Sequence, residues 1–98
     1  MVRFVSLFNF TEKGIGKYAD TVSRAEAFTK DAQKAGVKVT GLYWTVGKYD
    51  GVVVLEAPDE QAAMGVLLKL GANGFVRTQT MRAYDRTEME PVLAKASK

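Results

Sequence analysis

Hydrophobic residues gather in four short runs that predict β-strands, at residues 2–10, 37–46, 51–57 and 74–84. These runs are rich in valine, threonine and aromatic residues, which are typical of strands. The first and third runs are apolar at both alternating sets of positions, which predicts strands buried on both faces. The hydrophobic register shifts at Gly41, so a β-bulge is expected there.

Two segments with helical periodicity separate these strands. Residues 21–35 carry a stripe of apolar side chains, which predicts an amphipathic helix that follows Asp20 and stops at Gly36. Residues 60–70 carry a second stripe and stop at Gly71. A short C-terminal helix is predicted after the fourth strand. Thr87 and Glu90 fit a capping box, and the apolar residues of this helix are Met89, Val92, Leu93 and Ala96.

The predicted order is therefore β-α-β-β-α-β followed by a short helix, which is an α+β, ferredoxin-like antiparallel sheet with two helices on one face. Residues 1–84 form this domain and residues 85–98 the helical tail. Right-handed crossovers place the first and third strands in the centre. Two helices cover only one face of the sheet, and the other would expose an apolar patch too large for a monomer. We therefore expect a homo-oligomer, a dimer or higher, paired through the open sheet face.

The amino-acid composition limits which cofactors and reactive groups the protein can use. The 98 residues include no cysteine and no histidine, which argues against a disulfide, a thiolate nucleophile, and the usual zinc and heme sites, so no cofactor or metal is expected. The formal charge of +3 comes from scattered basic residues, a pattern that disfavours nucleic-acid binding. The N-terminus is unlike a signal peptide, and no apolar run is long enough to span a bilayer. A soluble cytoplasmic protein is expected.

Four pieces of the sequence form a recognisable set. They are the first strand leading to Thr11 and Gly14, the turn Gly47-Lys48-Tyr49-Asp50, the run at residues 54–59 and the run at residues 71–83. Together they cover most of the chain, and they resemble the GYD domain family. The resemblance implies a ferredoxin-like fold of the dimeric α/β barrel kind. It implies no established reaction.

The segment Gly14-Ile15-Gly16-Lys17-Tyr18-Ala19 fits the dinucleotide-binding pattern G-x-G-x-x-A, between a strand and a helix. Three observations favour a plain loop that needs glycine geometry. The first glycine lies four residues beyond Phe10, no acidic residue ends the second strand, and the second and third strands form a hairpin rather than a βαβ unit.

Tyr49 and Asp50 admit two interpretations. In a structural role, Asp50 accepts hydrogen bonds from N–H groups of the turn and the ring of Tyr49 packs over a strand end. In a functional role, the pair supplies a phenol and a carboxylate for acid–base chemistry at a subunit seam. Arg77 and Arg82 are five residues apart on one strand and should point to opposite faces. One of them could bind a substrate carboxylate, and the simpler role for each is an exposed edge-strand arginine that discourages sheet aggregation.

Polar and aromatic groups also lie together at Asn9, Tyr43, Trp44 and Thr45. Cofactor-free oxygenases of the dimeric α/β barrel class use asparagine and tryptophan in such a position, whereas core or interface packing is the simpler role for Trp44. The candidate ligand-binding set is Asn9, Tyr43, Trp44, Tyr49, Asp50 and Arg77. No catalytic residue is assigned.

Three functions are consistent with these patterns. The first is a small homo-oligomeric domain that binds a small organic ligand beside the sheet. The second is a cofactor-independent oxygenase or isomerase, for which Asn9, Tyr49, Asp50 and Arg77 would be the polar set; it rests on analogy between folds. The third is a structural or regulatory module whose sheet face binds another protein.

Overall fold

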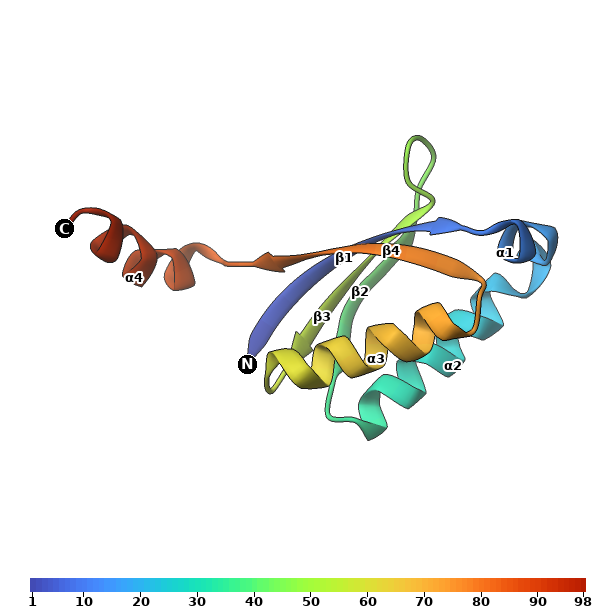
Figure 1. Ribbon diagram of the computed structural model, residues 1–98, viewed down its shortest axis with the longest axis horizontal. Helices are drawn as coiled ribbons and strands as arrows, with labels where there is room; N and C mark the ends of the chain where they lie inside the picture. The colour runs from blue at the N-terminus through green and yellow to red at the C-terminus, as the bar shows by residue number, and fades with distance from the viewer.

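A four-stranded antiparallel sheet forms one layer of the protein, and helices α2 and α3 form the other (Figure 1). The computed structural model describes residues 1–98. Its elements are β1 (Val2–Phe10), α1 (Glu12–Gly16), the 3-10 turn η1 (Tyr18–Asp20), α2 (Thr21–Lys34), β2 (Lys38–Trp44), β3 (Gly51–Ala57), α3 (Glu60–Ala72), β4 (Val76–Ala83) and α4 (Arg86–Ala96). The strand order is β2-β3-β1-β4, so the predicted ferredoxin-like plan with β1 and β3 at the centre is confirmed.

The two faces of the sheet are distinguished by strand register. On the helix side, Phe8, Val53 and Leu55 are buried. The opposite face carries six apolar side chains, which we call the open sheet face: Val5, Leu7, Tyr43, Val52, Val54 and Met81. They are neighbours across the strands, because Val5 lies opposite both Val54 and Met81. No element of the chain is packed over this cluster in the manner of α2 and α3 (Figure 1).

A bulge in β2 sets which side chains reach which face. The pairing steps from Val39 opposite Leu55 to Gly41 opposite Val54, which leaves Thr40 as the extra residue. The predicted bulge is thus confirmed. It turns Leu42 and Trp44 toward the helices and Tyr43 toward the open sheet face.

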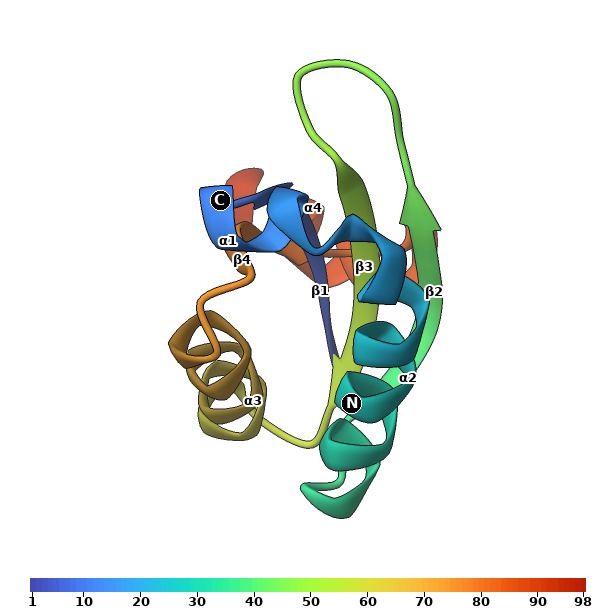
Figure 2. The same cartoon turned by 90° about the vertical axis from the view of Figure 1, so that its right-hand side faces the viewer.

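The core is small. Only 11 of the 98 residues are buried, and the largest fully buried side chains are those of Leu55, Val37 and Ser6. Figure 2 shows why: α2 and α3 stand apart over the sheet instead of packing closely along their lengths. A shallow core of this kind leaves apolar surface on both sides of the sheet.

Three sequence predictions were wrong in detail. The segment with Gly14 and Gly16 was expected to be a loop, but residues 12–16 form α1, because the Thr11 hydroxyl accepts the N–H of Gly14 and caps the helix. Helix α3 does not stop at Gly71; it continues to Ala72, and the chain reverses at Gly74, whose φ is +83°.

The start of the terminal helix is the third correction. The capping box is formed by Asp85 and Glu88, earlier in the chain than the predicted Thr87 and Glu90. Helix α4 extends from the end of β4 away from the other helices (Figure 1), and the molecule is therefore 51 Å long but only 18 Å thick. None of the helices is both long and apolar enough to cross a membrane.

Candidate functional site

The turn between β2 and β3 is tied to the end of β1 by Asp50. One oxygen of its carboxylate, Oδ2, accepts the backbone N–H of Phe10 at 2.8 Å. The backbone N–H of Asp50 donates to the carbonyl of Phe8, also at 2.8 Å. Next to this bridge, the side-chain amide of Asn9 donates to the carbonyl of Lys48 at 2.9 Å. The polar atoms of Asn9 and Asp50 therefore hold the hairpin against β1.

Tyr49 links the same turn to β4, and we call the meeting point of the turn with β1 and β4 the hairpin corner. Its hydroxyl lies 2.5 Å from Oε1 of Gln79 on β4, to which it donates a hydrogen bond. The carbonyl of Tyr49 accepts the hydroxyl of Thr45 at 2.7 Å within the turn. The sequence predicted that Asp50 accepts N–H groups of the turn itself. Its carboxylate instead accepts the N–H of Phe10 on β1, so this part of the prediction was wrong.

The remaining candidate residues are dispersed. Arg77 lies opposite Asn9 on the edge strand β4, and its guanidinium donates to the carbonyl of Gly71 at 3.0 Å. Arg82 lies opposite Phe4, on the other face from Arg77. Tyr43 and Trp44 point to opposite faces of β2. The hairpin corner thus brings together Asn9, Tyr49 and Asp50, with Arg77 beside them, and it separates Tyr43 from Trp44.

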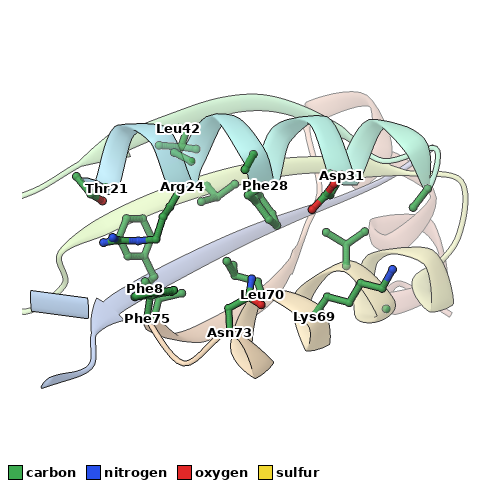
Figure 3. A pocket seen from close by; sticks show the side chains of 18 of the residues that line it. Phe8, Thr21, Arg24, Phe28, Asp31, Leu42, Lys69, Leu70, Asn73 and Phe75 are labelled. Atoms are coloured by element: carbon green, nitrogen blue, oxygen red, sulfur yellow. The ribbon is translucent and has the colours of Figure 1, made fainter. Parts of the chain in front are cut away.

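A groove between α2, α3 and the sheet forms a cavity with a volume of about 380 Å³ (Figure 3). Fifteen of its 22 lining residues are hydrophobic. Phe8, Phe28 and Leu70 approach it from three different elements (Figure 3). Its size and apolar lining are those of a small-molecule site. Among the six predicted candidates, only Trp44 lines this groove.

Two cations contact the ring of Phe75, which lines the groove. Arg24 also lines it, whereas Lys13 does not and donates to the carbonyl of Asn73 at 3.1 Å. The guanidinium carbon of Arg24 is 4.3 Å from the ring centroid of Phe75, and the ammonium of Lys13 is 4.4 Å from the same centroid. Phe75 is held there because its carbonyl accepts the backbone N–H of Thr11 at 3.1 Å. Every ion pair in the structure involves Arg3, so neither Arg24 nor Lys13 is paired with a carboxylate.

One polar atom of this cluster has no partner. Nη1 of Arg24 donates to the carbonyl of Lys17 at 2.9 Å, but Nη2 is buried and bonds to nothing in the protein. Buried donors are nearly always satisfied in folded proteins. Arg24 is not among the site residues predicted from the sequence, although one signal was present: Arg24 and Asp31 are seven residues apart on the same helix face as Phe28.

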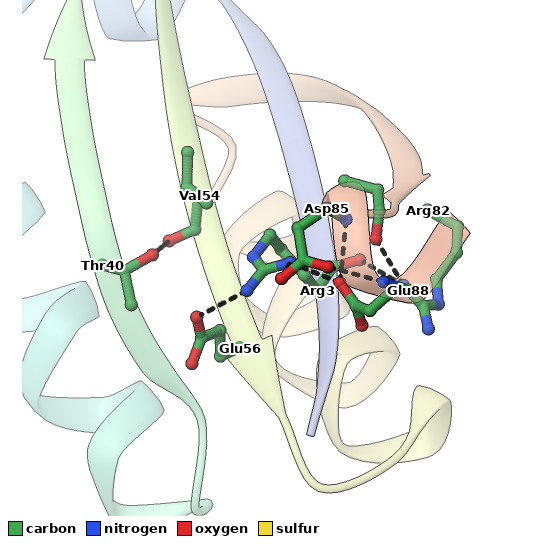
Figure 4. Close-up of polar contacts among 8 residues, drawn as sticks. Arg3, Thr40, Val54, Glu56, Arg82, Asp85 and Glu88 are labelled. Atoms are coloured by element: carbon green, nitrogen blue, oxygen red, sulfur yellow. Dashed lines mark hydrogen bonds and ion pairs between the residues drawn. The ribbon is translucent and has the colours of Figure 1, made fainter. Parts of the chain in front are cut away.

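The tail is attached to the domain through Arg3 (Figure 4). Its guanidinium donates to Glu88 at 2.6 Å and to Glu56 at 3.3 Å, and it lies 3.6 Å from Asp85. The hydrogen bond to Glu88 raises the pKa of Arg3 above its ordinary value, with a smaller contribution from Glu56. The apolar residues of α4 remain exposed: Met89, Val92 and Leu93.

The sequence pattern of the GYD domain matches residues 4–93. A protein of Thermus thermophilus, named glutamine synthetase and cystathionine beta-lyase binding protein, is 30% identical over 84 residues, which are 85% of this chain and 88% of that protein.

The crystal structure of TTHA0845, also from Thermus thermophilus, has the same fold, with a TM-score of 0.55 at 21% sequence identity. The match covers 87% of this chain and 95% of that one. The residues matched by the family pattern include the hairpin corner at Asn9, Tyr49 and Asp50 and the groove described above. This chain belongs to the GYD domain family.

Proposed function

We propose that this protein is a protein-interaction module that acts as a homodimer and binds an enzyme. The observation that carries the homodimer is the open sheet face, whereas enzyme binding rests on helix α4. It presents Val5, Leu7, Val52 and Val54 side by side on the two central strands, and Tyr43 and Met81 flank them with exposed fractions of 63% and 49%. Apolar patches of this kind on a soluble domain mark sites of protein association.

A second copy of the chain is the occupant that fits this face. A two-fold axis through the sheet would set the same apolar patch of each subunit against the other, as an isologous interface requires. The small core supports the same conclusion, because a chain with 11 buried residues of 98 gains much of its apolar burial by association. A specific interface should bury at least about 1,200 Å² in total.

Helix α4 is the surface that we assign to the enzyme. It projects beyond the sheet (Figure 1), and Met89, Val92 and Leu93 fall at i, i+3 and i+4, along one exposed stripe. Such a stripe is the recognition element of helix-in-groove complexes. The name of the relative from Thermus thermophilus supports a protein partner of this class, namely glutamine synthetase or cystathionine beta-lyase.

A direct binding measurement tests this function. Glutamine synthetase and cystathionine beta-lyase from the same organism as this chain would be titrated against the immobilised protein. Binding of at least one enzyme is expected, and Val92→Asp should abolish it while leaving the dimer intact. Met64→Asp, on the outer side of α3, is the control and should bind normally. Failure of both enzymes to bind, or undiminished binding by Val92→Asp, would contradict the assignment.

Ligand binding in the groove is a second candidate function, which the first does not exclude. It is supported by the 380 Å³ apolar cavity, which lies on the helix side and therefore stays open when the opposite face is covered. The oxygenase or isomerase alternative has the least support from the geometry. The polar atoms of Asn9, Tyr49 and Asp50 are engaged in hydrogen bonds at the hairpin corner, outside the groove lining.

A further inference from the structure

We propose that the groove between α2 and α3 binds an amphipathic carboxylate, with the acid group at Arg24 and the apolar body between the helices. This inference names the ligand class for the second candidate function and rests on it. Three features support it: the unpartnered donor of Arg24, the paired cations on Phe75, and the apolar continuation of the same cavity.

The acid end is defined by Arg24. Arg24 lines the groove, and its Nη2 is buried without an acceptor in the protein, so a rotation of the guanidinium toward a ligand acceptor in the groove would recover the hydrogen-bond energy lost on burial. A carboxylate is the acceptor that suits a guanidinium best, because the bond is assisted by charge. The ring of Phe75 and the carbonyl of Lys17 keep the guanidinium at the α1 end of the groove, where the acid group of such a ligand would meet it.

The local charge at this end is positive. Lys13 adds a second cation on Phe75, and neither cation has a carboxylate within ion-pair distance. The acidic residue of the groove, Asp31, lies two turns along α2 from Arg24, which is about 10 Å. Figure 3 shows Asp31 and Lys69 toward the other end of the groove. The acid at that end is therefore not placed to neutralise Arg24.

The apolar end sets the size of the ligand. A cavity of 380 Å³ corresponds to about a dozen water-sized groups, enough for a carboxylate with a medium-length aliphatic or aromatic body. Phe28, Leu70 and Val53 are among the apolar side chains that line it. Gly65 of α3 also lines the groove, and a Cβ added there would meet open space. A side chain built on Gly65 would therefore begin in open space and occupy part of the cavity.

Trp44 provides the readout. It is the single tryptophan of the chain and lines the groove, so a ligand bound there should change its fluorescence. The probe is decanoate below its micellar concentration, with decanol as the neutral analogue of equal chain length. Saturable binding of decanoate at least about tenfold tighter than that of decanol is expected, because the acid group supplies a charge-assisted bond.

Two variants locate the site. Arg24→Gln should weaken decanoate binding about tenfold or more and leave decanol unaffected, whereas Lys34→Gln, a matched charge loss on α2 outside the groove, should change neither. Gly65→Leu should abolish binding of both probes. Because leucine favours a helix over glycine, this variant is expected to remain folded, which keeps the test valid if Arg24→Gln unfolds.

The outcomes separate the two levels of the proposal. Equal affinity for decanol and decanoate would overturn the carboxylate assignment while leaving a ligand-binding groove. Absence of binding by both probes would overturn the groove as a small-molecule site. If, in addition, Gly65→Leu altered the oligomeric state, the occupant of the groove would be another protein chain.

Discussion

The carboxylate of Asp50 accepts the backbone N–H of Phe10 at 2.8 Å, which joins the β2–β3 turn to the end of β1 across 40 positions of sequence. The backbone N–H of Asp50 returns to the carbonyl of Phe8, so the turn makes two bonds to one strand. These bonds give the Gly47-Lys48-Tyr49-Asp50 motif a structural role: it fixes where the hairpin projects from the sheet.

Replacing Asp50 should therefore affect folding more than ligand binding. Asp50→Ala leaves the part-buried N–H of Phe10 without its acceptor, at a cost of about 1–3 kcal/mol in the free energy of unfolding. Asp50→Asn keeps an acceptor oxygen and should cost less. Urea denaturation followed by circular dichroism measures both. Unchanged stability of Asp50→Ala, combined with loss of a bound ligand, would instead favour a functional carboxylate.

Gly14 should tolerate no side chain. A Cβ at this position would collide with the carbonyl oxygen of Phe75, whose backbone is fixed by Thr11. Gly14→Ala should destabilise the fold by about 1–3 kcal/mol or more, since the obstacle is backbone and cannot rotate away. Gly16→Ala on the same helix meets no atom within 4 Å and is the control. Thermal melts that rank the two variants equally would refute this close packing.

Arg3 should control the attachment of α4. Arg3→Gln removes the ion pairs to Glu88, Asp85 and Glu56, so amide hydrogens in α4 should exchange faster while those in β1 and β3 keep their protection. Arg86→Gln, on the exposed first turn of α4, removes the same charge and should leave exchange unchanged. Equal exchange in the Arg3 variant and the parent protein would show that another contact holds the helix.

The same contact should persist at alkaline pH. Because the folded state raises the pKa of Arg3, the stabilisation is fully present below the pKa of the unfolded state and is lost only as pH rises through the higher folded value. Both lie far above neutrality, so titration of Arg3 predicts no loosening of α4 between about pH 7 and pH 10. Hydrogen exchange with rates corrected for pH measures this; release of α4 within that range would contradict it.

A matched pair of methionines tests where the proposed dimer interface lies. Met81→Asp places a charge on the open sheet face and should yield a monomer. Met64→Asp makes the same change at a comparably exposed position on α3 and should remain dimeric. Light scattering coupled to gel filtration distinguishes the two. A monomeric Met64 variant and a dimeric Met81 variant would place the interface on the helix side.

Periodicity predicted the fold well because the strongest local signals agree with the tertiary structure. The bulge at Gly41 and the central position of β1 and β3 both follow from where apolar residues change register or fill both faces. The errors concern the ends of α3 and α4 and one short helix that was predicted as a loop. Asp85 caps α4 in place of Thr87, and a glycine pair that suggested a loop forms α1, since Thr11 supplies the cap.

The groove was harder to predict because its key contacts are distant in sequence. Arg24 and Phe75 are brought together by the bonds between Thr11 and the segment before β4, which no local pattern encodes. The absence of close packing between α2 and α3 also depends on how both helices sit on the sheet (Figure 2). The hairpin residues were identified from their motif. The partner of the Asp50 carboxylate could not be predicted, because it depends on how β1 pairs with β3.

Native mass spectrometry of the gently purified wild-type protein tests the central claim most directly. The open sheet face predicts an assembly of twice the 10.7 kDa chain mass. Met81→Asp measured alongside it should appear at the mass of a single chain. A wild-type protein that is monomeric at micromolar concentration would contradict the homodimer, and with it the proposal that this face is an interface between two copies of the chain.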